Sequence, residues 1–139
     1  MLEGKPEVLV REELRVEGLP EPISHYTDAV RYGNLLFISG ASPHDGEGRL
    51  VGGDDVAAQT AQVLRNIQSV LAAAGASFAD ALKVTVYLTD INDRQAVNRV
   101  REQVFGSAKP ASTLVEVSAL ALPGMKVEIE MVAGLRAQP

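Results

Sequence analysis

A strict alternation of apolar and polar residues near the C-terminus constrains the fold more than any other feature of the chain. Side chains of a β-strand point to opposite faces in turn, so residues 126–134 are predicted to form a strand with one face in the core. Glu128 falls on the opposite face. A carboxylate there is either solvated, as most strand carboxylates are, or acts as a general base or a water-positioning group. The residues expected in the core are Val127, Ile129, Met131 and Ala133.

The most regular helical pattern covers residues 56–74. Its apolar side chains recur on one face, while polar residues such as Gln59 and Asn66 occupy other faces. Asp55 is the expected N-cap and Gly75 the expected C-terminal stop. We therefore predict an amphipathic α-helix, with Asn66 as a structural hydrogen-bonding residue rather than a ligand.

The remaining elements are shorter. Residues 82–89 alternate like the C-terminal strand, and a second helix is expected after the cap Asn92-Asp93. A hairpin at residues 27–39 and a strand at residues 113–117 complete the pattern, and residues 11–16 could add a first strand. The order ββαβαββ predicts an α+β fold, in which one sheet carries both helices on the same face.

The sheet face opposite the helices is expected to carry both polar and apolar side chains. In places it is too apolar to remain fully exposed to solvent. We therefore infer that the protein self-associates through this face, with small-molecule clefts at the subunit boundaries. The residues expected there are Thr85, Tyr87, Glu116, Glu128 and Val132.

Length, charge and cysteine content limit the functions that the chain can have. At 139 residues the chain fits one domain, residues 1–139, with residues 1–10 as a flexible N-terminal arm. The 13 basic and 18 acidic residues give a net charge of -5, without the basic patch that nucleic-acid binding requires. The chain has no cysteine, no signal-like N-terminus and no stretch of membrane-spanning length. We expect a cytoplasmic protein that binds neither nucleic acid nor membrane. His25 and His44 lack a recognisable third ligand, so no metal site is expected.

Several short motifs follow one another in a specific order within residues 22–135. They include Gly33-Asn34, Ala73-Ala74-Gly75, Val84-Thr85-Val86-Tyr87, Asp90-Ile91-Asn92-Asp93, Pro110-Ala111 and Lys126-Val127-Glu128-Ile129-Glu130. In this order the chain resembles the reactive intermediate deaminase family, also called Rid or YjgF. The resemblance implies a chorismate-mutase-like single domain with a mixed β-sheet, and a homotrimer with clefts between subunits. It also implies hydrolysis of imines or enamines to ketones and ammonia, without a metal or an organic cofactor.

The resemblance further assigns residues of the cleft. It implies Glu128 as the water-positioning glutamate, and substrate-binding roles for Tyr26, Ser39, Gly40 and Asn98. The family's arginine, which grips the substrate carboxylate, follows the Pro-Ala motif, and here that position is Ser112. Loss of a bidentate guanidinium predicts weak binding of simple imino acids. Leu114, where the family often has a cysteine, is expected to make the pocket wall more apolar.

Three functions remain open from the sequence. The first is an imine or enamine deaminase of altered specificity, whose substrate is larger, less acidic or held by another cation; Lys109 and Arg31 are the nearest in sequence. The second is a non-catalytic trimer that binds a small metabolite in the intersubunit cleft. The third is a different hydrolytic reaction in that cleft, although neither histidine lies near Ser112 in sequence to activate it as a nucleophile.

Overall fold

Six strands and two α-helices make up the fold in a computed structural model that describes residues 9–136. Of the expected N-terminal arm, residues 1–8 lie outside the described residues, and Leu9 and Val10 are exposed. The strands are β1 (Arg11–Leu14), β2 (Ala29–Tyr32), β3 (Leu35–Ala41), β4 (Ala81–Leu88), β5 (Ala111–Glu116) and β6 (Val127–Gly134). The helices are α1 (Val56–Ala73) and α2 (Arg94–Phe105), with short 3-10 turns at Phe78–Asp80 and Ile91–Asp93. The predicted order is confirmed, including the additional first strand.

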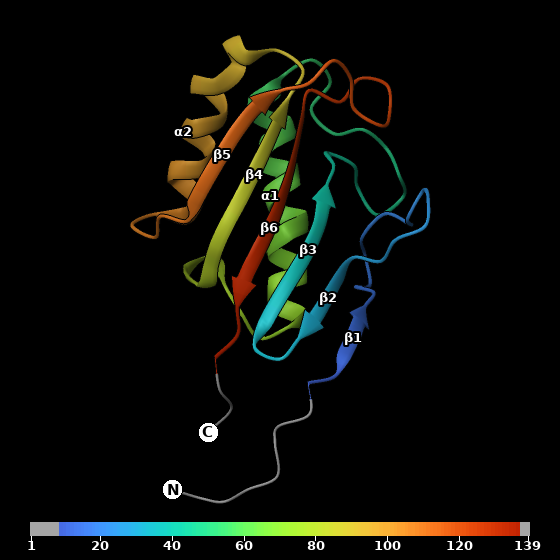
Figure 1. The fold of residues 1–139 in the computed structure, drawn as a ribbon. Coiled ribbons are helices and arrows are strands. Elements are labelled where there is room, and N and C mark those ends of the chain that lie inside the picture. Colours follow the sequence, from blue (N-terminus) through green and yellow to red (C-terminus); the bar gives the residue numbers. More distant parts are fainter. Residues whose placement is uncertain (1–8, 137–139) are drawn as a thin grey trace, which may run out of the picture.

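The strands form one mixed sheet in the order β1-β2-β3-β6-β4-β5. All neighbours are antiparallel except β4 and β5, which run parallel because α2 connects them as a crossover. Figure 1 shows α1 behind the middle of the sheet and α2 beside it, behind the β5 edge. Both helices therefore cover one face, as predicted, and the other face is left open.

The alternation in β6 separates the two faces as the sequence predicts. Val127, Ile129, Met131 and Ala133 are at most 2% exposed and pack in the core beneath the helices. The alternation in β4 holds only from Val84 onward. A register shift between Ala81 and Lys83 disturbs the start of that strand, and Leu82 remains 50% exposed.

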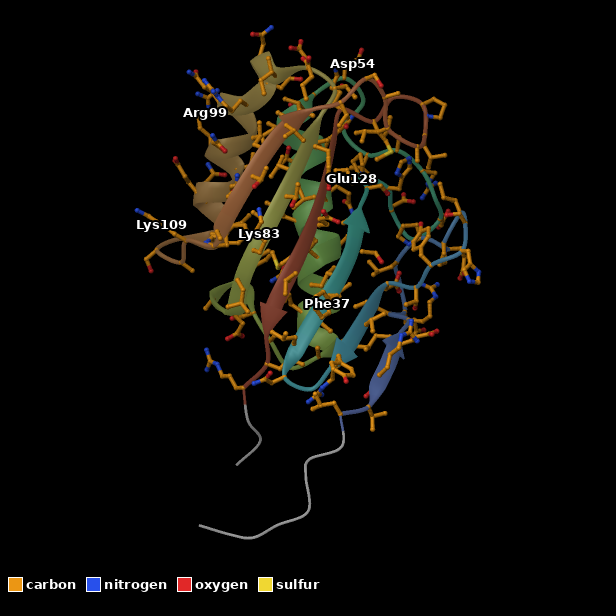
Figure 2. The ribbon with its side chains drawn as sticks, in the orientation of Figure 1. Phe37, Asp54, Lys83, Arg99, Lys109 and Glu128 are labelled. Carbon is orange, nitrogen blue, oxygen red and sulfur yellow. The ribbon has the colours of Figure 1, made fainter. Side chains whose placement is uncertain are left out.

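The open face keeps apolar side chains in contact with solvent. Figure 2 shows Phe37, Lys83 and Glu128 on this face of the sheet. Phe37 is 46% exposed, which is unusual for a phenylalanine on the third of six strands. Within residues 9–136 no helix is both long enough and apolar enough to cross a membrane.

The two helices begin differently. The Asp55 carboxylate accepts hydrogen bonds from the backbone N–H groups of Ala57 and Ala58, so the predicted cap of α1 is confirmed, and Gly75 follows that helix with φ of 74°. The predicted cap of α2 is wrong, because Asp93 makes no side-chain capping bond. A 3-10 turn runs directly into α2 and holds Asp93 in a helical backbone conformation, whereas a capping residue needs an extended one. Asp90 instead caps that turn, accepting a bond from Asn92 N at 2.9 Å.

Candidate functional site

A β-bulge in β3 places Ser39 and Gly40 beside the polar side of β6. Ile38 pairs with Met131 and Ala41 pairs with Ile129, so Ser39 and Gly40 together oppose the single residue Glu130. Bulges bend a strand and re-aim its side chains, and they occur often beside active sites. This bulge lies next to the carboxylates of β6.

Gly40 lies against Glu128. A Cβ atom at Gly40 would be 2.9 Å from both Cδ and Oε2 of Glu128, closer than non-bonded atoms approach. The absence of a side chain at Gly40 therefore lets the carboxylate approach the bulge this closely. The sequence resemblance paired these two residues in one site, and the structure brings them into contact.

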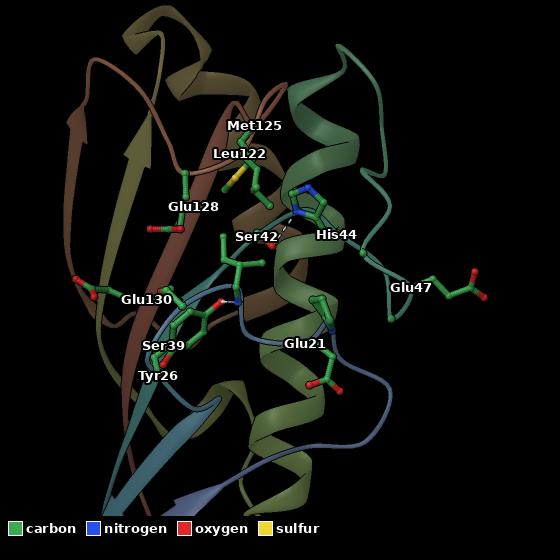
Figure 3. A pocket seen from close by; sticks show the side chains of 17 residues that line it. Glu21, Tyr26, Ser39, Ser42, His44, Glu47, Leu122, Met125, Glu128 and Glu130 are labelled. Atoms are coloured by element: carbon green, nitrogen blue, oxygen red, sulfur yellow. Dashed lines mark hydrogen bonds between the residues drawn. The ribbon is translucent and has the colours of Figure 1, made fainter.

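A cleft of about 680 Å³ opens beside Glu128. We call it the Glu128 cleft. Figure 3 shows Glu128 and Glu130 on one wall, from β6, and His44 on the opposite wall, from the loop that follows β3. Apolar side chains of Ile23, Leu122 and Met125 contribute to its lining. The volume is that of a small-molecule site.

The Glu128 cleft is acidic. Among the described residues that line it are four glutamates and no lysine or arginine; the glutamates are Glu21, Glu47, Glu128 and Glu130. A small anion in this cleft would meet negative charge on several sides. The described lining of this cleft therefore offers no positively charged anchor for a carboxylate.

Burial raises the pKa of Glu128 above its ordinary value of 4.5, and the nearby negative charge of Glu130 adds to the increase. A carboxylate with a raised pKa is a stronger base than a solvated one, which suits it to take a proton from water. Glu130 is itself held by Tyr87, whose hydroxyl donates a hydrogen bond of 2.6 Å to Glu130 Oε1. That bond is the largest cause of a raised pKa of Tyr87, so Tyr87 serves as a neutral donor.

Tyr26 and Ser39 also line the Glu128 cleft, as expected from the resemblance. The Tyr26 ring is 46% exposed, and its hydroxyl accepts a long bond of 3.4 Å from Ile23 N. Ser39 Oγ donates to the Thr27 carbonyl at 2.6 Å, so its oxygen lone pairs remain free to accept a bond. Four of the expected site residues, Tyr26, Ser39, Gly40 and Glu128, thus meet in one place.

Two buried polar residues of α1 support this cleft. Gln59 is fully buried; its amide donates to the carbonyls of Gly53 and Gly124 and accepts a 2.8 Å bond from Lys126 N. It thereby fixes the turn that leads into β6. Asn66 donates to the carbonyls of Ser42 and His44, which confirms its expected structural role. The sequence placed Gln59 and Asn66 away from the apolar face, but both are buried because loops fold over them.

His44 was not expected among the cleft residues. It is 5% exposed, and its Nδ1 lies 2.9 Å from Ser42 Oγ. Burial lowers the pKa of His44, so the ring is neutral near pH 7. No sequence spacing pointed to it, because the loop that carries it is positioned by Asn66 from a distant helix. The described residues hold no group of three side chains suited to a metal ion.

Asn98 and Ser112 lie elsewhere. They line a separate depression of about 280 Å³ between α2 and the start of β5, together with Arg101, Glu102 and Lys109. We call it the Arg101 depression. Arg101 Nη2 donates to Ser112 Oγ at 2.9 Å, and Nη1 lies 3.4 Å from Asn98 Oδ1. Arg101 was missed in the sequence, although its position three residues after Asn98 puts both on one helix face.

Strand register explains why the two groups do not meet within one chain. Ser112 pairs with Val84, which is buried under the helices, whereas Glu128 pairs with Tyr87. Positions 84 and 87 are an odd number of residues apart, so their side chains point to opposite faces of the sheet. Ser112 and Glu128 of the same chain therefore lie on opposite faces, with β4 between their strands.

The remaining expected residues fall outside both hollows. Leu114 packs against the hydrophobic core, so it lines neither the Glu128 cleft nor the Arg101 depression. Arg31 lies in β2 and donates from Nε to the Gly33 carbonyl at 3.3 Å. Of the two cations considered as substitutes for the arginine, only Lys109 lies near Ser112.

Comparison with known proteins gives one consistent result. A family described as Endoribonuclease L-PSP matches residues 17–135. A RutC family protein of Pyrococcus horikoshii is 46% identical over 125 residues, covering 89% of this chain and 98% of that protein. The human 2-iminobutanoate/2-iminopropanoate deaminase is 39% identical over 126 residues, covering 90% of each. A crystal structure of a conserved Rid family protein of unknown function from Yersinia pestis superposes with a TM-score of 0.85 at 36% identity, covering 91% of this chain and 100% of the other.

Proposed function

The chain belongs to the Endoribonuclease L-PSP family, which comprises the Rid and YjgF proteins, and from this membership we propose that it hydrolyses reactive imines or enamines to a ketone and ammonia. The observation that carries the proposal is Glu128, a partly buried carboxylate with a raised pKa held against Gly40 at the wall of a small-molecule cleft. Relatives named as 2-iminobutanoate/2-iminopropanoate deaminases support the reaction class.

The chemistry requires one water molecule and no other reactant. Glu128 accepts a proton as the water oxygen attacks the carbon of the protonated imine, which gives a neutral carbinolamine. Glu128 then delivers this proton to the nitrogen, the carbon–nitrogen bond breaks as the carbinolamine hydroxyl gives its proton back to Glu128, and ketone and ammonia leave. An enamine enters the same path after protonation at its β-carbon. Apolar side chains in the lining lower the polarity around Glu128 and so strengthen its basicity.

The complete site is proposed to form between copies of the chain, in a homotrimer. Glu128 and Ser112 point to opposite faces of the sheet within one chain, so a single chain cannot place both against one small substrate. β5 is an edge strand, and the Phe37 side of the sheet is exposed and partly apolar, which supports contact between copies through these surfaces.

We do not propose RNA cleavage for this chain, although its family is described as Endoribonuclease L-PSP. RNA binding depends on neutralising phosphates with basic side chains. The cleft that holds Glu128 is lined by four glutamates, and the whole chain carries a net charge of -5.

Binding without catalysis is a second candidate function. The observation that favours it is the lack of any lysine or arginine among the described residues lining the Glu128 cleft. Such a trimer would take up a small uncharged or apolar metabolite and release it unchanged.

The test is ammonia release from freshly generated 2-iminobutanoate and from a bulkier aromatic imino acid. We expect turnover by the wild-type protein and a loss of at least about 100-fold in kcat for Glu128→Gln. Glu47→Gln is the matched control, because Glu47 is an exposed carboxylate of the same cleft. Absence of turnover on either substrate, with activity gained in Ser112→Arg, would favour the binding protein instead.

A further inference from the structure

Arg101 is a charged residue for which the sequence predicted no role. It lies on α2, one turn after Asn98, and its guanidinium spans from that helix to the edge strand β5. Both of its hydrogen bonds go to neutral oxygens, Ser112 Oγ and Asn98 Oδ1. A guanidinium has five N–H donors in a planar fork, so most of its donor capacity remains unused.

Among the residues that the structure describes, no acidic side chain pairs with Arg101. Burial alone lowers its pKa, without any opposing contribution from a nearby acid. Arginine nevertheless stays charged in proteins, and a partly buried charge without a partner costs free energy. A bound anion would offset that cost.

Arg99, two residues before it, shows the ordinary alternative. Arg99 is exposed, and Figure 2 shows it pointing away from the sheet. Arg101 instead lines a depression of about 280 Å³, with the Lys109 side chain as a second positive charge. Glu102 is the one acid among the described lining residues, and it is not within salt-bridge distance of Arg101.

We propose that Arg101 is the anion anchor of the active site and binds the carboxylate of a 2-imino acid. This inference rests on the proposed function, because it names the group that holds the substrate of that reaction. Ser112 occupies the strand position at which the family has its arginine, and it carries no charge. Arg101, on the neighbouring helix, places its guanidinium beside Ser112. The substrate class is then a 2-imino acid rather than an uncharged imine or enamine.

The acidic character of the Glu128 cleft makes this anchor necessary. An imino acid held only among Glu21, Glu128 and Glu130 would be repelled by them. The Arg101 guanidinium of another copy of the chain offsets that negative charge. It also orients the substrate through paired hydrogen bonds to the carboxylate. The carboxylate would then be fixed at one end and the imine carbon would lie near Glu128 at the other.

The test is isothermal titration of the full-length protein with 2-oxobutanoate, the non-reacting keto acid, and with its uncharged methyl ester. We expect Arg101→Gln to weaken binding of 2-oxobutanoate by at least about tenfold while leaving binding of the ester unchanged. Arg99→Gln is the matched control, since it removes the same charge from the same helix, and it should change neither affinity by more than about twofold.

A second variant separates the role in binding from a role in folding. Arg101→Gln combined with Ser112→Arg moves the guanidinium from helix to strand, and it should recover most of the lost affinity. Equal affinity of the wild type for acid and ester, or unchanged 2-oxobutanoate binding in Arg101→Gln, would overturn the inference. So would failure of the double variant to bind while its thermal unfolding matches that of the wild type.

These measurements do not use catalysis. A protein that binds 2-oxobutanoate through Arg101 but releases no ammonia would contradict the proposed function and leave the anchor standing. A protein that releases ammonia equally well with Arg101→Gln would do the reverse.

Discussion

The Glu128 cleft and the Arg101 depression carry opposite charges on opposite faces of one sheet. The cleft combines a raised-pKa carboxylate with apolar walls, and among its described lining residues it has no cation. The depression is smaller, and it combines an uncompensated guanidinium with two neutral hydrogen-bond partners. The comparison teaches that one chain keeps its partly buried carboxylate and its uncompensated guanidinium apart, so the proposed reaction needs both hollows.

The largest expected effect comes from mixing two inactive proteins. Glu128→Ala and Arg101→Gln chains, co-expressed with different tags and purified as mixed trimers, should recover roughly a third of wild-type ammonia release at low substrate, since each mixed trimer pairs an intact cleft with an intact depression at one of its three subunit boundaries. Glu128→Ala alone should be nearly inactive, and Arg101→Gln alone should keep about a tenth of the activity or less. Mixing Glu128→Ala with Glu128→Gln is the control and should recover nothing. No recovery in the first mixture would mean that the two hollows never work together.

The second prediction concerns the support of the cleft. Gln59→Met should lower the free energy of unfolding by about 3 kcal/mol, because it leaves the carbonyls of Gly53 and Gly124 and the N–H of Lys126 without their buried partner. Gln68→Met on the exposed side of α1 is the control and should change stability by less than about 0.5 kcal/mol. Urea unfolding measures both. Equal losses would show that Gln59 has no special part in holding β6.

Gly40 offers a way to damage the cleft without touching the depression. Gly40→Ala should displace the Glu128 carboxylate, because the added methyl would lie 2.9 Å from it, and should lower kcat by about tenfold or more. Gly134→Ala is a matched strand glycine, whose added methyl would lie at an ordinary 3.5 Å from Leu82. Steady-state kinetics with 2-iminobutanoate checks this. An unchanged kcat in Gly40→Ala would show that contact with the bulge does not position Glu128.

The smallest expected effect is a shift of the pH profile. Glu130 raises the pKa of Glu128, so Glu130→Gln should move the acidic limb of kcat/KM to lower pH. The same shift affects stability: because the folded-state pKa lies above 4.5, the wild type gains stability as pH falls through that pKa and loses it as pH rises. Glu128→Gln should remove that dependence, and Glu47→Gln should leave it intact. An acidic limb that moves to higher pH in Glu130→Gln would contradict this account.

Regular local patterns made most of the fold predictable. The alternation in β6 and the periodicity of α1 depend on which residues follow one another, and the structure has both as predicted. The cap at Asp55 was predicted for the same reason, since its bonds reach only two and three residues along the chain. The prediction of a cap at Asp93 was wrong because the preceding 3-10 turn holds Asp93 in a helical backbone conformation, and no simple sequence pattern predicts that turn.

The site was predictable in part. The resemblance grouped Tyr26, Ser39, Gly40 and Glu128, and the structure brings these four into one cleft. The burial of Gln59 depends on segments 65 and 67 residues away, so no local pattern could reveal it. The contact between Arg101 and Ser112 was hidden for a related reason, since Ser112 is eleven residues further along and on a different element.

The sequence alone determined the order of the strands and helices, the acidic balance of the chain, and the absence of an arginine at position 112. These follow from residue identity and from contacts between near neighbours in the chain. Only the tertiary structure decided that Glu128 and Ser112 face opposite ways and that Arg101 reaches Ser112. The physical reason is that the side a strand residue faces depends on which strands pair and in what register, and pairing is a contact between residues distant in sequence.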